Sequence, residues 1–192
     1  MVIKHDLLPK QKTRKHNLKV DIDLYPLATE LYEELEKNGI IERIKEIPQL
    51  GVIKVKKKLA KTRFDYVMLQ LYLHKLIKSK LQGDLRYTYN NYINSKEFRE
   101  DYVYPNKKNK PSMGDIFQLL TIVYNIGHFY NTFAASRAVT MIAEEDDAYY
   151  NLVVRACEDA RYQNAAKIIL DNKNYQRLHL LNSILILEQC DK

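Results

Sequence analysis

The sequence is poor in the residues that define several protein classes. Only two of its 192 residues are cysteine, Cys157 and Cys190, and neither lies in a CxxC pair. This argues against a disulfide framework or a zinc knuckle, and it favours a reducing, cytoplasmic setting. No stretch approaches the roughly 18 consecutive apolar residues of a membrane span, so we expect no membrane partner. The N-terminal stretch MVIKHDLLPKQKTRKH lacks the apolar segment of a secretory signal.

Glycine is also scarce, and several common catalytic motifs are missing. The five glycines are scattered along the chain, so they form no glycine-rich loop of the kind that cradles phosphates. The sequence contains neither GxSxG nor HExxH, and neither cysteine has a histidine at a motif spacing. We therefore expect both cysteines to be small buried apolar residues.

Basic residues outnumber acidic ones. The formal net charge is +7 and the pI is about 9.2. This excess favours an anionic partner, either nucleic acid or nucleotide phosphate. The alternative is a solvated basic surface on a lysine-rich protein, and composition alone leaves both interpretations open.

Apolar periodicity predicts an all-α fold. Residues 1–20 are basic and show no period, so we expect an N-terminal arm followed by one helical domain over 21–192. Helices are expected from Pro26 to the Asn38-Gly39 pair and over 40–47. Alternation of apolar and basic residues predicts a short β-hairpin near 50–58.

A long helix is expected over 62–81, packed against a helix that begins near Asp115. The second helix is almost wholly apolar, which predicts a buried central element that Gly127 interrupts. Further helices follow to the end of the chain. The helix expected over 62–81 has a wide apolar face, made of Phe64, Val67, Met68, Leu71, Leu73, Leu76 and Ile77.

Two other polar features are assigned structural roles. The run Glu144–Asp147 is predicted to form a helix N-terminus, where acidic side chains complement the helix dipole. His74 and His179 each lie in an apolar helical run, which predicts core or boundary histidines whose hydrogen bonds are satisfied.

Three fragments, in order, resemble the HD-domain phosphohydrolases, and most closely their dNTP triphosphohydrolase branch. They are IPQLGVIKVKKKLAKTRFDYVMLQLYL, LLTIVYNIGHFYNTF and, more weakly, LEQCDK. The resemblance is best over 21–128 and implies an HD-domain-like helical bundle. Because the family's domain continues beyond the position of Lys192, we expect a compact variant, a fragment, or one part of an assembly. Apolar surface on the last helix, LLNSILILEQC, is then expected to attract a protein partner or a second copy.

The resemblance implies a divalent metal held by a histidine, a His-Asp pair and a distant aspartate. The matching positions here are Tyr66, the pair Tyr124-Asn125, and Asp191. A phenol and a neutral amide are poor ligands for a divalent cation. We therefore expect no catalytic residue, no metal and no cofactor, and instead a hydrogen-bonded polar network around Tyr66, Tyr124 and Asn125.

Other positions of the pattern are retained. Gln49 and Arg63 match residues that contact the nucleotide sugar and phosphate in the family, and His128 matches a histidine beside the site. Alternatively, His128 is a packing residue. Arg63 has a second interpretation too, as an anchor of the helix start that pairs with Asp65, Glu42 or Glu46. The family's further catalytic histidine has no counterpart, because Phe133 stands at that offset.

Residues 83–112 interleave tyrosine with basic side chains, a pattern that suits single-stranded nucleic acid, because bases stack on tyrosine and cations contact phosphate. The same segment also holds acidic residues, so its tyrosines are equally suited to packing against the protein body. A basic stretch lies nearby in sequence. The candidate nucleic-acid residues are Lys54, Lys56, Lys57, Lys58, Arg86, Tyr89, Lys107, Lys108 and Lys110.

Three functions follow from these patterns. The leading hypothesis is a catalytically inactive HD-domain-like module that binds a nucleotide or nucleic acid. The second is an active metal-dependent phosphohydrolase whose metal site has shifted to Asp65, His128 and Asp191. The third is a nucleic-acid-binding subunit that uses residues 83–112.

Overall fold

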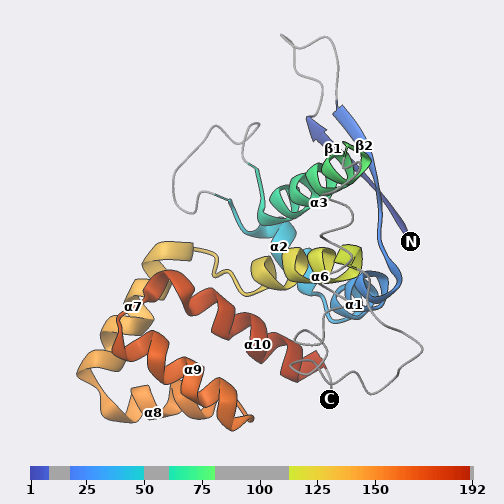
Figure 1. Ribbon diagram of the computed structural model, residues 1–192. Coiled ribbons are helices and arrows are strands. Elements are labelled where there is room, and N and C mark those ends of the chain that lie inside the picture. Colours follow the sequence, from blue (N-terminus) through green and yellow to red (C-terminus); the bar gives the residue numbers. More distant parts are fainter. Residues whose placement is uncertain (9–17, 50–60, 81–112, 191–192) are drawn as a thin grey trace. The chain divides into compact units, whose positions relative to one another are not determined.

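The computed structural model describes residues 1–8, 18–49, 61–80 and 113–190. It is mostly helical with one small antiparallel sheet, so the predicted all-α class is confirmed (Figure 1). The hairpin predicted near 50–58 lies outside the described residues. Within the described ranges, no helix is both long and apolar enough to cross a membrane. The chain forms two compact units, which are Met1–Leu31 with Met68–Thr121 and Tyr32–Val67 with Ile122–Lys192.

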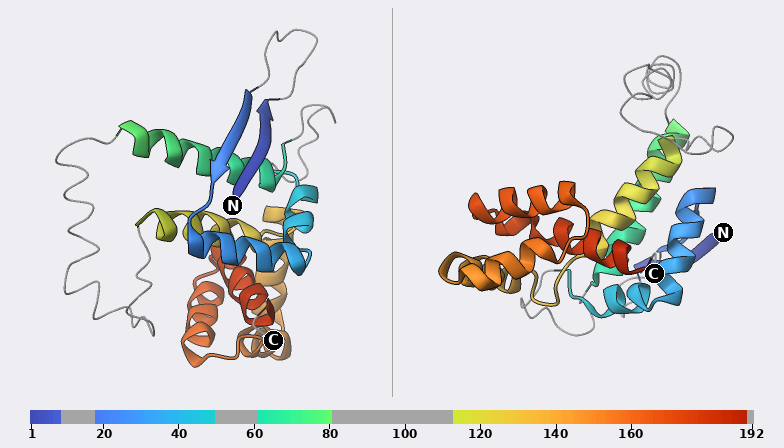
Figure 2. Two further views of the ribbon diagram at one scale, coloured as in Figure 1. Left: turned by 90° about the vertical axis from the view of Figure 1, so that its right-hand side faces the viewer. Right: turned by 90° about the horizontal axis from the view of Figure 1, so that it is seen from below.

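The N-terminal residues of the first unit form a sheet where the sequence predicts an arm. Strand β1 (Val2–Leu8) pairs antiparallel with β2 (Leu18–Asp23), as the blue strands of Figure 2 show. Leu7, Val20 and Ile22 are buried. The expectation of an arm is therefore corrected, because apolar and polar residues alternate in β2, which gives that strand one buried face, and β1 pairs with it.

In the first unit, side chains of α6 (Met113–Ile126) hold the start of α1 (Pro26–Lys37). The first N–H groups of a helix have no partner within the helix. Here the Leu27 N–H donates to Asp115 Oδ1 at 3.2 Å, and the neighbouring Tyr25 N–H donates to Gln118 Oε1 at 2.8 Å. Helix α1 begins at Pro26 and ends before Asn38-Gly39, as predicted, and Gly39 has the left-handed φ of 74°.

Helix α3 (Arg63–Lys80) also lies where the sequence predicts it, but its apolar face is only partly buried. Phe64, Val67, Met68 and Leu71 are buried, whereas Leu73, Leu76 and Ile77 are exposed. The exposed side chains follow the buried ones along the helix, so its C-terminal half keeps apolar residues in solvent contact. In the first unit, His74 stacks on Phe117 of α6 with ring centroids 4.5 Å apart.

The prediction that α6 is a buried central helix holds for only one of its faces. Phe117, Leu120 and Tyr124 are exposed, while Gln118, Ile122 and Ile126 are buried. The helix therefore has two faces, and the almost uniform apolar sequence conceals which of them packs.

The second unit contains α2 (Ile40–Glu46), α7 (Thr132–Glu145), α8 (Asp147–Arg155), α9 (Ala160–Asp171), the 3-10 turn η2 (Tyr175–Arg177) and α10 (Leu178–Cys190). Helices α7 to α10 gather around one core, coloured orange to red in Figure 1. The fully buried Cys157 lies in this core, and burial raises its pKa to about 11. The buried core residues are Ala143, Val154, Cys157, Ala166, Leu170, Leu178 and Leu181.

The expected apolar surface on the last helix is not observed. Leu178, Leu181 and Ile186 of α10 are buried in the second unit, because this helix packs its apolar residues against α9 and η2. The exposed large apolar residues of this unit's helices include Met141 and Ile142 on α7, with others on α8 and α9.

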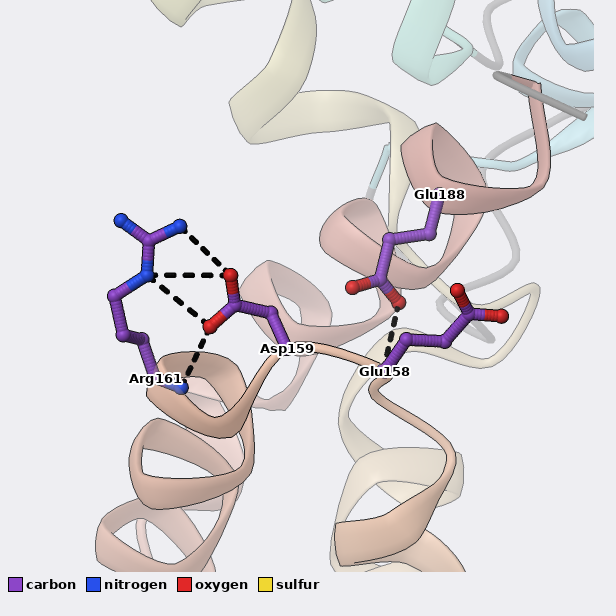
Figure 3. Close-up of polar contacts among 4 residues, drawn as sticks. All are labelled: Glu158, Asp159, Arg161 and Glu188. Carbon is purple, nitrogen blue, oxygen red and sulfur yellow. Dashed lines mark hydrogen bonds and ion pairs between the residues drawn. The ribbon is translucent and has the colours of Figure 1, made fainter. Parts of the chain in front are cut away.

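Acidic side chains begin two helices of the second unit. The Asp146 carboxylate accepts from the N–H groups of Ala148 and Tyr149 at 2.8 and 3.1 Å, which confirms the helix N-terminus predicted within Glu144–Asp147. Asp159 caps α9 in the same way and also pairs with Arg161 (Figure 3). This pairing lowers the pKa of Asp159 to about 2.

Candidate functional site

The predicted ligand residues Gln49 and Arg63 lie on two backbone segments that pair. The Arg63 N–H donates to the Ile47 carbonyl at 2.8 Å, and the Gln49 N–H donates to the Lys61 carbonyl at 2.8 Å. These bonds flank an antiparallel bridge between Pro48 and Thr62. The paired segments therefore fix where α3 begins.

A reciprocal capping arrangement sets the first turn of α3. The Asp65 N–H donates to Thr62 Oγ1 at 3.2 Å, and the Thr62 N–H donates to Asp65 Oδ2 at 2.9 Å. This is a capping box made with aspartate in place of glutamate. The capping box accounts for the one acidic residue of the sequence KTRFDYVML, because the Asp65 carboxylate accepts hydrogen bonds from Thr62.

Arg63 does not form the predicted ion pair. Within the described ranges its side chain makes no salt bridge with Asp65, Glu42 or Glu46, and its Nε atom is buried without a hydrogen-bond partner. The residue is only 9% exposed. Burial lowers the pKa of this guanidinium, while Tyr66 and Tyr124 act in the opposite direction. The interpretation of Arg63 as an ion-paired anchor is therefore corrected.

The C-terminal end of α6 is held by three side-chain hydrogen bonds from other elements of the second unit. Arg43 of α2 donates from Nη1 to the Ile126 carbonyl at 2.7 Å and from Nη2 to the His128 carbonyl at 2.6 Å. Asn182 of α10 donates to the Gly127 carbonyl at 2.7 Å. Carbonyls at a helix C-terminus lack intrahelical donors, so these bonds fix the backbone that carries His128.

Gly127 allows α10 to approach this backbone closely. A Cβ atom at this position would lie 1.9 Å from the His179 carbonyl oxygen and 2.4 Å from the Ser183 nitrogen. Such separations are far below van der Waals contact, so only glycine fits here. The interruption that the sequence predicts at Gly127 is thus a contact point between α6 and α10.

This approach stacks two buried imidazoles, His128 and His179. Their ring centroids are 4.3 Å apart and their planes differ by 6°. The Tyr124 ring makes a T-shaped contact with His179, with centroids 4.7 Å apart and planes inclined by 74°. His128 is 6% exposed and His179 is 5% exposed. We call Arg63, His128 and His179 the Arg-His-His cluster.

The hydrogen-bonding potential of the Arg-His-His cluster is incompletely used. His179 Nδ1 lies 2.8 Å from the Gln176 carbonyl, which only accepts, so Nδ1 carries a proton. His179 Nε2 and both ring nitrogens of His128 are buried without hydrogen-bond partners in the described part of the chain. The sequence predicted that the hydrogen bonds of His179 are satisfied. This is correct for Nδ1 and wrong for Nε2.

Burial and nearby positive charge keep both imidazoles neutral at neutral pH. Burial, Arg63, the His179 ring and Arg43 together lower the pKa of His128 to about 3. Burial is also the main cause that lowers the pKa of His179, and Arg63 adds to it, although the bond to Gln176 opposes the shift. Both causes disfavour an added positive charge in this region.

The predicted polar network does not form. The hydroxyls of Tyr66 and Tyr124 make no hydrogen bond to Asn125 or to each other in the described ranges, and Tyr124 is 50% exposed. Asn125 is fully buried. Tyr124 instead contacts both stacked histidines through its ring, which lies nearly perpendicular to theirs.

Several predicted residues lie outside the described ranges. They are Asp191, the basic residues Lys54, Lys56, Lys57 and Lys58, and, from the tyrosine-rich segment, Arg86, Tyr89, Lys107, Lys108 and Lys110. Their assignments stay predictions.

The described residues at this site do not fit a divalent cation. The groups that act on or contact the stacked histidines include Arg63, Arg43 and Tyr124, and guanidinium groups repel a metal ion. Across the described ranges, no three His, Cys, Asp or Glu side chains gather closely enough to hold one. The chemistry that suits buried arginine and imidazole is the binding of an anion.

Sequence inspection missed two members of this site, His179 and Arg43. His179 lies 51 positions after His128 along the chain, so no local motif joins them. Arg43 carried a weak signal, because it follows Ile40 and Ile41 and precedes Ile44 on a short helix whose other inward positions are apolar.

Two cavities of the second unit are lined by residues outside the Arg-His-His cluster. One, of about 340 Å³, is polar and is lined in part by Glu144, Asp147, Asp171 and Lys173. The Tyr150 hydroxyl donates to Asp171 at 2.8 Å, and Lys173 pairs with Glu144. The other, of about 260 Å³, is apolar, with Asn182 as one of its few polar residues.

Comparison of the chain with protein-family models, curated proteins and solved structures finds no match in any of the three.

Proposed function

We propose that this chain is a non-catalytic, HD-domain-like module that binds the phosphate of a nucleotide or nucleic acid at the Arg-His-His cluster. The observation that carries the proposal is the set of buried polar atoms on Arg63, His128 and His179 that have no partner among the described residues. Leaving a buried donor or acceptor unsatisfied costs about 1–3 kcal/mol. Such groups persist where a ligand completes their hydrogen bonds.

The lack of catalysis is inferred from the residue types at the positions that the family uses for its metal. Tyr66, Tyr124 and Asn125 offer no imidazole or carboxylate, and Arg63 and Arg43 act on the nearby His128 with positive charge. Phosphohydrolase chemistry of this kind depends on a cation that activates water or polarises a phosphoryl oxygen. We therefore expect binding without turnover, in a cytoplasmic setting.

Two measurements test this proposal. Incubation with dNTPs and Mn²⁺ or Mg²⁺ should release no triphosphate above background, and the same nucleotides should bind in an equilibrium assay. Arg63→Gln should weaken binding by at least about tenfold, since a charge-assisted bond contributes about 1.5–3 kcal/mol. The control is Arg155→Gln, an exposed arginine of α8 that should leave binding unchanged.

The same assay also tests the alternative function, an active enzyme with a shifted metal site. It requires Asp65 as a ligand, but the Asp65 carboxylate accepts hydrogen bonds from the Thr62 N–H and hydroxyl. Metal-dependent release of triphosphate that is lost in Asp65→Asn would favour the enzyme over the binding module.

A further inference from the structure

We propose that the Arg-His-His cluster binds one tetrahedral oxyanion, of the phosphate or sulfate type, and that binding draws about one proton from solvent onto the imidazole pair. This inference rests on the proposed function, because it concerns the same site. It adds His179 as a ligand-binding residue and makes affinity depend on pH.

The hydrogen-bond polarity of the neutral rings is the first step. Because His179 Nδ1 donates to the Gln176 carbonyl, a neutral His179 has only a lone pair at Nε2. A neutral His128 has one N–H and one lone pair. A fully deprotonated oxyanion such as sulfate offers acceptors only, so a ring lone pair directed at it repels it. One added proton turns a lone pair into an N–H donor.

The charges around the pair supply the second step. Arg63 of α3 acts on both rings, and Arg43 of α2 acts on His128. Tyr66 of α3 and Tyr124 of α6 act on Arg63, and the Tyr124 ring also contacts His179. The guanidiniums and burial oppose protonation, which is why the pKa of His128 is about 3. An anion bound among these groups places a negative charge beside the rings. That charge favours the protonated imidazolium form and raises its pKa.

The stacking distance limits the number of protons to about one. With ring centroids 4.3 Å apart, a first imidazolium repels a second, so the two rings titrate as a coupled pair. Tyr124 is the most exposed residue of this region, and its ring lies nearly perpendicular to that of His179. We therefore expect the anion to reach the cluster along Tyr124.

The test uses NMR of the histidine rings in the whole chain, with sodium sulfate compared against sodium chloride at matched ionic strength from pH 5.5 to 7.5. Sulfate stays a dianion over this range, so any proton taken up belongs to the protein. We expect sulfate to raise the apparent pKa of the His128–His179 pair into this range. Because binding takes up about one proton, sulfate affinity should weaken as the pH rises, by a factor approaching about tenfold per pH unit. Inorganic phosphate itself takes up a proton over this range, so it tests only whether the site also binds this anion.

Variants separate this inference from the proposed function. Arg63→Gln should abolish the sulfate effect, and His179→Asn should remove the proton uptake. His74→Asn, which alters a stacked histidine of the first unit, should change neither. Sulfate binding that depends on Arg63 but leaves both rings neutral would overturn the inference and leave the proposed function intact. If neither sulfate, phosphate nor nucleotide binds, both fail. The comparison of the two salts decides the question in the unmodified chain even where a variant does not fold.

Discussion

At the scale of single residues, Gly127 has the most stringent requirement. We expect Gly127→Ala to lower the free energy of unfolding by about 1–3 kcal/mol or more, because overpacking a close backbone contact forces α10 away from α6. Urea unfolding measures this. The control is Gly39→Asn, since Gly39 has open space around it and asparagine tolerates its positive φ. Equal stability of Gly127→Ala and the parent chain would contradict the observed approach of His179.

A second residue-scale prediction concerns His128 and pH. Its folded pKa of about 3 lies below the ordinary 6.5 of an unfolded histidine, so the folded state binds fewer protons between these values. The stabilisation is complete above about pH 6.5 and is lost as pH falls towards 3, with a slope approaching about 1.4 kcal/mol per pH unit.

Urea unfolding of the parent chain and His128→Asn between pH 4 and 7 measures this contribution. The variant should show a shallower pH dependence, whatever its absolute stability, and His5→Asn is the control for loss of a histidine elsewhere. A slope that His128→Asn leaves unchanged would show that this ring is not a buried neutral group.

At the scale of elements, the capping box at the start of α3 is open to a double-mutant cycle. Thr62→Ala and Asp65→Ala should each lower the free energy of unfolding by about 1 kcal/mol. Because the two side chains satisfy each other's N–H groups, the double variant should cost less than the sum of the single ones. Strict additivity in urea unfolding would mean that the two bonds act independently.

Sequence patterns located helices better than they located contacts. The limits of α1 followed from Pro26 and Asn38-Gly39, since these residues act on the backbone locally. The strand β1 was missed because its residues, VIKHDLL, do not alternate between apolar and polar and lie in a basic segment. The pair His128–His179 could not be foreseen, because it depends on how closely α10 approaches Gly127, a contact between residues far apart along the chain. The same limit explains why Tyr124 was expected to form a hydroxyl network.

At the scale of the whole molecule, the net charge of +7 supports one prediction about nucleic acid. Binding of a single-stranded oligonucleotide should weaken steeply with salt, with a logarithmic slope of about −0.7 per phosphate contact. If the stretch around Lys56, Lys57 and Lys58 makes such contacts, changing these three lysines to glutamine should reduce both the affinity and the slope.

The control for that experiment has the same change in net charge at lysines that are already ion-paired. The three lysines form ion pairs, Lys37 with Glu34, Lys45 with Glu42 and Lys173 with Glu144. Changing all three to glutamine removes the same amount of positive charge. Each of these lysines lies beside a carboxylate, which repels an approaching phosphate. If both triple variants lose affinity equally, net charge alone attracts the strand. If only the first loses affinity, the basic stretch contacts phosphate directly. Binding that does not respond to salt would rule out the nucleic-acid function, because contacts between lysine and phosphate always release counterions.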